Sequence, residues 1–114
     1  MATLTTQEVR RSGLAPTYAA AAVGGDSFTP GDDTFLHVKN TSGGALTVTV
    51  VTPNSAFEDA TIADIAVSVP ATTGDRMIGP FPSQHFADPT DGLADITYSG
   101  VTNLTVAVLK IRKP

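Results

Sequence analysis

The chain of 114 residues contains no cysteine. This absence excludes disulfide bonds, thiol catalysis and thiolate metal sites, and it suits folding in a reducing cytosol. Long hydrophobic runs are also missing: the longest spans Ala19 to Val23, far short of the roughly 20 residues that cross a bilayer. The N-terminus lacks the apolar segment of a secretory signal. We therefore expect a protein that is synthesised in the cytoplasm and does not enter a membrane.

Charged and aromatic residues are scarce as well. Charged residues make up 16% of the chain, against about 25% in an ordinary domain, and the formal net charge is −4. Lys and Arg are scattered, apart from the Arg10-Arg11 pair and the tail with Lys110, Arg112 and Lys113. Because phosphate binding depends on clustered Lys and Arg, nucleic acid is not expected as a partner. Tryptophan is absent, which weakens the case for a module that stacks sugars on exposed aromatic rings.

Small, polar and turn-forming residues take the place of charge. The chain has 10 glycines and 8 prolines. Short runs of β-branched residues are separated by turn signals every 8–12 residues, which is typical of a sandwich or barrel. About seven to nine strands fit the sequence, without βαβ spacing and without an amphipathic helix of three turns. We predict an all-β chain: a single-domain antiparallel β-sandwich of the jelly-roll or Ig-like type.

The clearest strand pattern lies between Thr34 and Pro53. Apolar and polar residues alternate from Thr34 to Asn40 and again from Leu46 to Val51, with β-branched residues prominent in the second run. This period of two predicts two strands. Gly43 and Gly44 lie between them and can adopt a positive φ without steric cost. The stretch is therefore predicted to form a β-hairpin.

Shorter patterns predict the remaining elements. Pro80 and Pro82 have no backbone donor, so the strand next to them is expected at a sheet edge. The predicted elements are a strand of small residues in Tyr18–Val23, a loop over Asp26–Asp33 anchored by Phe28, a polar connection over Asn54–Asp64 pinned by Phe57 and Ile62, strands over Ile65–Val69, Arg76–Phe81, Leu93–Ser99 and Leu104–Ile111, and a turn at Asp88–Gly92.

The N-terminal segment is predicted to be separate from the sandwich. Residues 1–16 contain few large apolar side chains, so they are expected to form an arm or edge strand that is ordered by pairing, whereas residues 17–114 form the sandwich domain. A frayed terminus is the alternative. Arg10 and Arg11 are either partners for acidic patches on another protein or a solvated pair. The candidate partner-binding residues are Thr3, Leu4, Thr5, Val9, Arg10 and Arg11.

A search for catalytic and metal-binding patterns finds none. His37 and His85 have neither a neighbouring cysteine nor a second nearby histidine, so a zinc site is not expected, and both are predicted to be surface or interface residues. Asp26, Asp32 and Asp33 bracket one loop, and Asp88 and Asp91 bracket another. These aspartates suit turn formation, with a calcium loop as the alternative. We expect no cofactor and no enzymatic activity; a carboxylate-dependent enzyme is the remote alternative.

Four segments resemble the small β-sandwich decoration, or cement, proteins of tailed bacteriophage capsids. The resemblance implies a protein that binds the major capsid protein on the outer surface of an assembled head and strengthens the shell. It also implies a homo-oligomer, with a trimer favoured, localisation in the virion and no catalytic residues. The segments that carry the resemblance are Thr34–Asn40, Arg76–Phe81, Asp95–Ser99 and Leu104–Val108.

Two other functions fit the same residues. The first is another virion component, such as a head-fibre base or tail module, which would use the same fold and the same lack of chemistry. The second is a glycan-binding β-sandwich. The number of copies in purified particles separates decoration from a vertex or tail component, and binding measurements with glycans test the second alternative.

Overall fold

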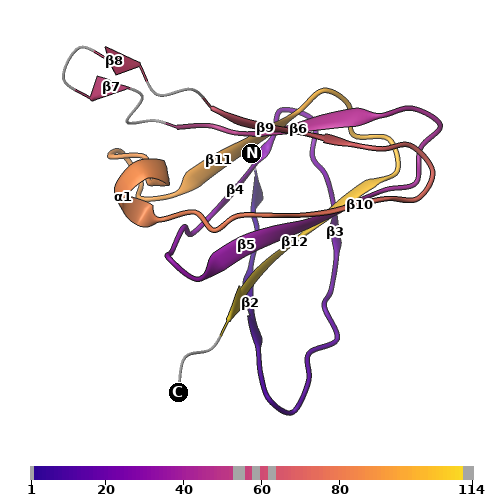
Figure 1. Ribbon diagram of the computed structural model, residues 1–114, viewed down its shortest axis with the longest axis horizontal. Coiled ribbons are helices and arrows are strands. Elements are labelled where there is room, and N and C mark those ends of the chain that lie inside the picture. The colour runs from indigo at the N-terminus through magenta and orange to yellow at the C-terminus, as the bar shows by residue number, and fades with distance from the viewer. Residues whose placement is uncertain (1, 53–55, 58–59, 62–63, 112–114) are drawn as a thin grey trace.

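The regular secondary structure of the described residues is almost entirely β-strand (Figure 1). A computed structural model describes residues 2–52, 56–57, 60–61 and 64–111. Within these ranges the strands form two large sheets and one small two-stranded ladder. The prediction of an all-β chain is confirmed, apart from one short helical turn. None of the described residues belongs to a helix with the length and apolarity needed to cross a bilayer.

The first large sheet, sheet 1, combines strands from the whole length of the chain. β1 runs parallel to β4, and the other neighbouring strands are antiparallel. The five described strands follow the spatial order β1 (Ala2–Thr3), β4 (Asp26–Phe28), β11 (Ala94–Tyr98), β6 (Leu46–Val50) and β9 (Ile65–Val69).

The second large sheet, sheet 2, is organised around its last strand. β12 pairs with β5 on one side, and β3 and β2 follow one another along its other side. β2 is parallel to β12, and the other pairs are antiparallel. The predicted position of β10 at an edge is confirmed. The strands are β10 (Gly74–Ile78), β5 (Thr34–Asn40), β12 (Leu104–Ile111) and β2 (Thr6–Val9), with β3 (Ala19–Ala20) as the further partner of β12.

Two smaller elements lie outside these sheets. The predicted connection over residues 54–64 contains the antiparallel ladder of β7 (Ala56–Phe57) and β8 (Ala60–Thr61). The predictions for the side chains in that connection fall outside the described residues. α1 (Ser83–Phe86) forms a single helical turn between β10 and β11.

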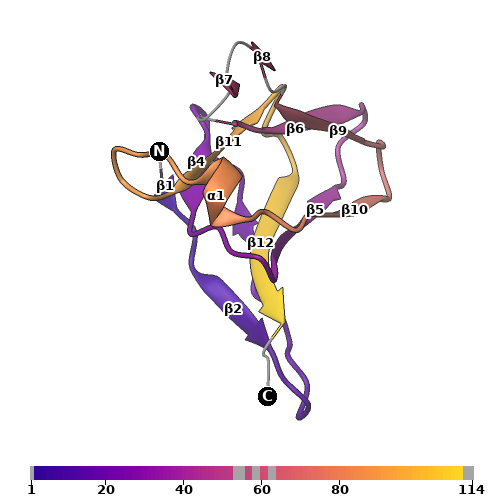
Figure 2. The same cartoon turned by 60° about the vertical axis from the view of Figure 1, so that its left-hand side comes forward.

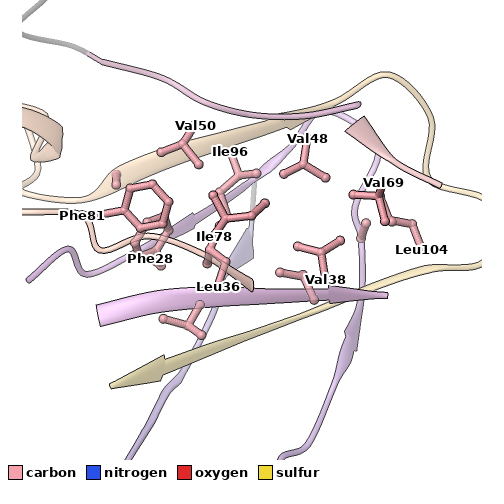
Figure 3. Packing of buried hydrophobic residues seen from close by; sticks show 14 of the residues in the cluster. Phe28, Leu36, Val38, Val48, Val50, Val69, Ile78, Phe81, Ile96 and Leu104 are labelled. Carbon is pink, nitrogen blue, oxygen red and sulfur yellow. The ribbon is translucent and has the colours of Figure 1, made fainter. Parts of the chain in front are cut away.

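The hydrophobic core lies between the two sheets (Figure 3). β6 and β9 lie above β5 and β10 in both overall views (Figures 1 and 2), and each sheet contributes one apolar face to the shared core. An aromatic group lies at the end of the core near α1, where the Phe81 ring makes edge-to-face contacts with those of Phe28 and Phe86. The fully buried aliphatic side chains of the core include Leu36, Val38, Val48, Val50, Val69, Ile96, Leu104, Val106 and Val108.

The predicted hairpin between β5 and β6 is wrong. Both strands form at the expected residues, but β5 belongs to sheet 2 and β6 to sheet 1. The chain therefore passes from one sheet to the other between them. Gly43 and Gly44 do not adopt a positive φ. Each strand turns apolar side chains to one face, Leu36 and Val38 in β5 and Val48 and Val50 in β6, and these side chains meet across the core instead of lying side by side. Alternation alone fits both arrangements.

Asn40 fixes this crossing. The side chain is completely buried at the end of β5. Its Nδ2 group donates to the carbonyl of Gly44 at 3.0 Å and to the carbonyl of Val69 at 3.1 Å. Its Oδ1 atom accepts from the backbone and the hydroxyl of Ser42 at 2.9 and 2.6 Å. Because Val69 ends β9, this one amide connects the turn and both sheets.

Replacement by alanine is expected to have different effects at Gly44, between β5 and β6, and at Gly74, at the start of β10. A Cβ at Gly44 would meet no atom within 4 Å, so Gly44→Ala should change the free energy of unfolding by less than about 1 kcal/mol. A Cβ at Gly74 would lie 1.8 Å from the carbonyl oxygen of Pro70, so Gly74→Ala should cost about 1–3 kcal/mol. Urea denaturation of both variants tests this, and a large loss for Gly44→Ala would instead favour the hairpin turn.

Strand β4 was also not predicted from the sequence. Residues 26–28 were predicted as part of a loop, but they form a strand that β1 and β11 flank. Asp26, Ser27 and Phe28 are all buried, and Phe28 is fully enclosed, as expected of the anchor residue. A run of only three residues with two polar members carries no alternation signal, so pairing on both sides decides its conformation.

The N-terminal segment passes from one sheet to the other. β1 lies at the edge of sheet 1 and β2 at an edge of sheet 2, with Leu4 packed against the core between them. The chain between β2 and β3 forms a loop that projects beyond the sheets, at the bottom of both views (Figures 1 and 2). The Gln7 side chain fastens the two legs of this loop through a pair of hydrogen bonds with the backbone of Thr17, at 2.8 and 2.9 Å.

Candidate functional site

The outward face of sheet 2 carries the most connected group of chemically functional side chains in the described residues. Alternation along β5 turns Leu36 and Val38 into the core and His37 to the opposite face. The strand register places Met77 of β10 on one side of His37 and Ala107 of β12 on the other. Because Ala107 is small, a side chain from beyond β12 can cross over it to reach His37.

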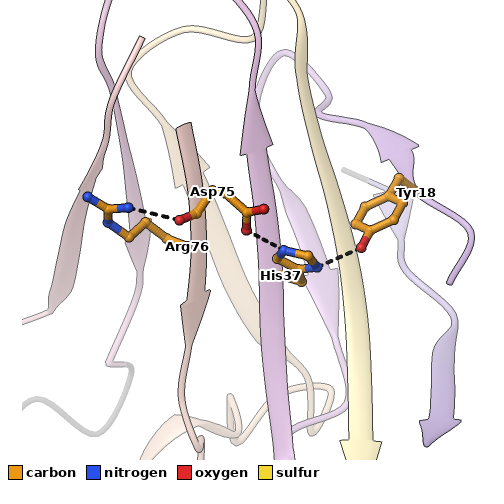
Figure 4. Close-up of polar contacts among 4 residues, drawn as sticks. All are labelled: Tyr18, His37, Asp75 and Arg76. Atoms are coloured by element: carbon orange, nitrogen blue, oxygen red, sulfur yellow. Dashed lines mark hydrogen bonds and ion pairs between the residues drawn. The ribbon is translucent and has the colours of Figure 1, made fainter. Parts of the chain in front are cut away.

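Tyr18 makes this crossing (Figure 4). Its hydroxyl lies 2.6 Å from Nδ1 of His37, and the two rings meet edge to face with centroids 5.4 Å apart. On the other side, Nε2 of His37 contacts Oδ1 of Asp75 in β10. We call these residues the Tyr18–His37–Asp75 line; it joins the segment before β3, the middle of β5 and β10 across the width of sheet 2.

The partners fix the proton positions in the line. An ionised carboxylate only accepts hydrogen bonds, so Nε2 of His37 donates to Asp75. In the neutral imidazole the other nitrogen then has a free lone pair, and Nδ1 accepts the phenolic proton of Tyr18. The side chain of His37 is only 10% exposed, whereas that of Asp75 is 56% exposed. One end of the line therefore reaches solvent while its centre is covered.

Two basic side chains flank the line. Nζ of Lys39 lies 4.4 Å from the centroid of the Tyr18 ring, a cation–π contact. Nη1 of Arg76 donates to the backbone carbonyl of Asp75 at 2.9 Å (Figure 4). In functional-group terms the line is a hydroxyl, an imidazole and a carboxylate in sequence, the order in which a nucleophile, a base and an orienting group are arranged in covalent catalysis.

Known proteins offer no guide to this site. No family model, curated protein or solved structure matches the chain. The function is therefore inferred from the geometry and composition of this chain.

The Tyr18–His37–Asp75 line was not predicted from the sequence, because neither histidine has a chemically related residue close to it along the chain. Its three residues are 19 and 38 positions apart along the chain. The alternation over Thr34–Asn40 places His37 on the same face as Lys39, but the pairing of β5 with β10 and β12 could not be read from the sequence. His37 was predicted as a surface or interface residue. In this chain Tyr18 covers it, and the residue as a whole, backbone included, is 8% exposed. The side chain of His85 lies outside the described ones.

The predicted partner-binding residues fall into two groups. Thr3, Leu4 and Thr5 lie where the chain passes between the sheets, with both threonines exposed and Leu4 partly buried. Arg10 and Arg11 are exposed and follow directly after β2 in the projecting loop, where the amide of Gly13 donates to the carbonyl of Arg10. Val9, the sixth candidate, belongs to neither group. It is half-buried at the end of β2, opposite Ile111 of β12.

The acidic residues do not gather into a metal site among the described side chains. No group of three or more His, Asp or Glu residues in those ranges is arranged to hold an ion. Asp88 and Asp91 serve the predicted turn, where their Oδ1 atoms accept from the amides of Thr90 and Leu93 at 2.8 and 3.0 Å. Turn formation is therefore confirmed as the role of these two aspartates.

Asp26 differs from the other aspartates because it is only 1% exposed. Its Oδ2 atom accepts from the hydroxyl of Tyr98 at 2.7 Å and from the amide of Ala22 at 3.2 Å. Its Oδ1 atom has no hydrogen-bond partner among the described residues. Burial, followed by the hydrogen bond to Asp26, raises the pKa of Tyr98 well above its usual range. The two tyrosines of the chain thus occupy contrasting environments.

Proposed function

We propose that this chain is a structural protein of a phage virion that binds the outer surface of an assembled head and stabilises the shell. The observation that carries the proposal is the path of the N-terminal segment. β1 and β2 supply edge strands to different sheets, and the loop that begins with Arg10 and Arg11 projects beyond both sheets (Figure 1). In this proposal the two sheets form a β-sandwich of the jelly-roll or Ig-like type, and residues 1–16 are its attachment arm.

Sheet edges suit this role because they offer unpaired backbone groups. An edge strand pairs with an extended segment of another protein through main-chain hydrogen bonds, with little demand on side-chain identity. β1 and β2 are short and mostly polar. A mostly polar edge can recognise a capsid subunit and still resist pairing with unrelated proteins, because such pairing would bury few apolar side chains.

The charge distribution favours the outer face of a head over its DNA-filled interior. The chain carries a formal charge of −4, and packaged DNA would repel such a protein. Arg10 and Arg11 supply local positive charge at the start of the projecting loop, where they can meet acidic residues of the major capsid protein. Attachment as a homo-oligomer, with a trimer favoured, would multiply weak individual contacts into a strong overall hold.

The experiment measures copy number and rebinding. Quantitative mass spectrometry of purified particles should find hundreds of copies on each head. Heads that lack the protein should bind added wild-type chain, and reversing both charges (Arg10→Glu with Arg11→Glu) should reduce occupancy at least tenfold, as expected when two charge-assisted contacts are lost. Arg76→Glu, which reverses the charge of a single exposed arginine of β10, controls for charge reversal away from the arm and should bind like wild type.

Other outcomes point to the other functions. A handful of copies would assign the chain to a head-fibre base or tail module, and absence from particles would exclude both virion roles. Binding to a glycan in calorimetry, with no occupancy on heads, would instead support the glycan-binding sandwich. Equal occupancy of the charge-reversed variant would leave decoration standing but remove Arg10 and Arg11 from the contact.

A further inference from the structure

We infer that Tyr18 is an activated nucleophile, a site of covalent modification by activated sulfonyl and acyl electrophiles. The inference follows from the geometry of the Tyr18–His37–Asp75 line and does not depend on the proposed function. A phenol reacts with such electrophiles when a base removes its proton during attack, and an orienting group must hold that base in the correct tautomer. The line supplies a phenol, a base and an orienting carboxylate in contact.

The proton path is defined at each atom. The Tyr18 hydroxyl is 2.6 Å from Nδ1 of His37, within the range needed for general-base assistance. Asp75 accepts the hydrogen on Nε2, which keeps the lone pair of Nδ1 directed at the phenol. When the imidazole takes the phenolic proton, the carboxylate of Asp75 faces the positive charge that develops on it and stabilises that charge.

Lys39 favours the negative charge that develops on the other partner. Its ammonium group lies 4.4 Å from the centroid of the Tyr18 ring. The attraction between a cation and a ring increases as the ring approaches the phenolate form, because full negative charge is then added to the quadrupole term. Tyr18 therefore has a proton acceptor on one side and a cation on another.

Tyr18 is also reachable from solvent. It lies on the outward face of sheet 2, not in the core, and it is partly exposed. Asp75 at the far end of the line is 56% exposed. A small electrophile can approach this face without unfolding the sheets.

Tyr98 provides an internal comparison. Its hydroxyl donates to the buried carboxylate of Asp26 at 2.7 Å, so loss of its proton would place two negative charges side by side. Burial and Asp26 both raise the pKa of Tyr98. The same electrophile therefore meets one tyrosine whose hydroxyl contacts an imidazole base and one whose hydroxyl is held by a buried carboxylate.

The reaction with a sulfonyl fluoride balances without any further reactant. Oη of Tyr18 attacks the sulfur atom, a new S–O bond forms, and the S–F bond breaks as fluoride leaves with its electron pair. The phenolic proton passes to Nδ1 of His37 and then to water, which restores the neutral imidazole. The product is a stable aryl sulfonate on Tyr18.

The test treats the folded full-length chain with benzenesulfonyl fluoride at neutral pH and maps the label by peptide mass spectrometry. We expect Tyr18 to be labelled well before Tyr98, and faster in the folded chain than in the same chain unfolded in urea. His37→Gln should slow the labelling of Tyr18 about a hundredfold, the lower end of a general-base contribution. Glutamine can still accept from the phenol and donate to Asp75, so the hydrogen-bond pattern is kept while the base is lost.

Several results would overturn the inference. They are equal rates at Tyr18 in folded and unfolded chain, preferential labelling of Tyr98 or Lys39, or an unchanged Tyr18 rate in folded His37→Gln. If His37→Gln does not fold, Asp75→Asn supplies the second test, because it disturbs only the orienting group at the exposed end of the line. That variant should slow labelling about tenfold, the loss expected of a supporting group that acts through the base, and an unchanged rate would overturn the inference equally.

Discussion

Replacing Phe81 with alanine is expected to lower the free energy of unfolding by about 3–5 kcal/mol. The side chain is 1% exposed, and its ring centroid lies 5.5 Å from that of Phe28 and 5.1 Å from that of Phe86. The variant would lose the burial of the ring and both edge-to-face contacts, and a cavity would remain at the end of the core near α1. Urea denaturation followed by far-ultraviolet circular dichroism measures the loss.

Phe35 provides the matched control for this prediction. Phe35→Ala also replaces a phenylalanine with alanine, but Phe35 lies half-buried on the outward face of sheet 2 and is not part of the core between the sheets. Phe35→Ala should therefore cost about 1 kcal/mol, since less apolar surface returns to water and no closed cavity forms. Losses of similar size in the two variants would show that the end of the core near α1 is not packed as described.

Asn40→Ala is expected to cost about 2–4 kcal/mol, the second largest effect. The variant loses the donors to the carbonyls of Gly44 and Val69 and the acceptor for Ser42. The carbonyl of Val69 would lose this donor at a buried position, and an unsatisfied buried group costs more than the net value of the hydrogen bond. Urea denaturation of the variant at neutral pH measures the change.

Ser42→Ala separates the role of Asn40 from that of the turn. It removes the hydroxyl that donates to Oδ1 of Asn40 and to the carbonyl of Gly44, but it leaves the amide donors of Asn40 in place. A loss of about 1 kcal/mol is expected from this partly exposed serine. If Asn40→Ala costs no more than Ser42→Ala, the crossing between the sheets does not depend on the buried amide.

The strands could be predicted where alternation was long enough. β5, β6 and β9 form at the residues that alternation indicated, and β12 forms where a run of mostly apolar and β-branched residues indicated a strand. Their partners could not be predicted. Two alternating strands joined by Ser-Gly-Gly fit a hairpin and a crossing equally well, and the choice depends on Asn40, whose contacts reach Val69 far along the chain.

The candidate site shows the same limit more strongly. Alternation predicted the face on which His37 lies, but its neighbours come from two other segments. Tyr18 reaches His37 only because β12 places the small residue Ala107 between them, a matter of register that local patterns do not contain. Asp75 precedes the predicted strand over Arg76–Phe81 and lies within β10, directly beside β5. Chemistry assembled across strands in this way becomes visible only with the pairing.

The central place of β12 in sheet 2 determines when this protein can fold during synthesis. β2, β3 and β5 all pair with β12, yet β12 leaves the ribosome after every one of them. Until then sheet 2 lacks the strand that holds its two halves together, and the nascent chain has exposed edges. Because the pairings that complete the sheet join distant parts of the chain, such as Thr6 with Val108, folding is expected to wait until β12 has been synthesised and to be slow, in the millisecond-to-second range of all-β domains.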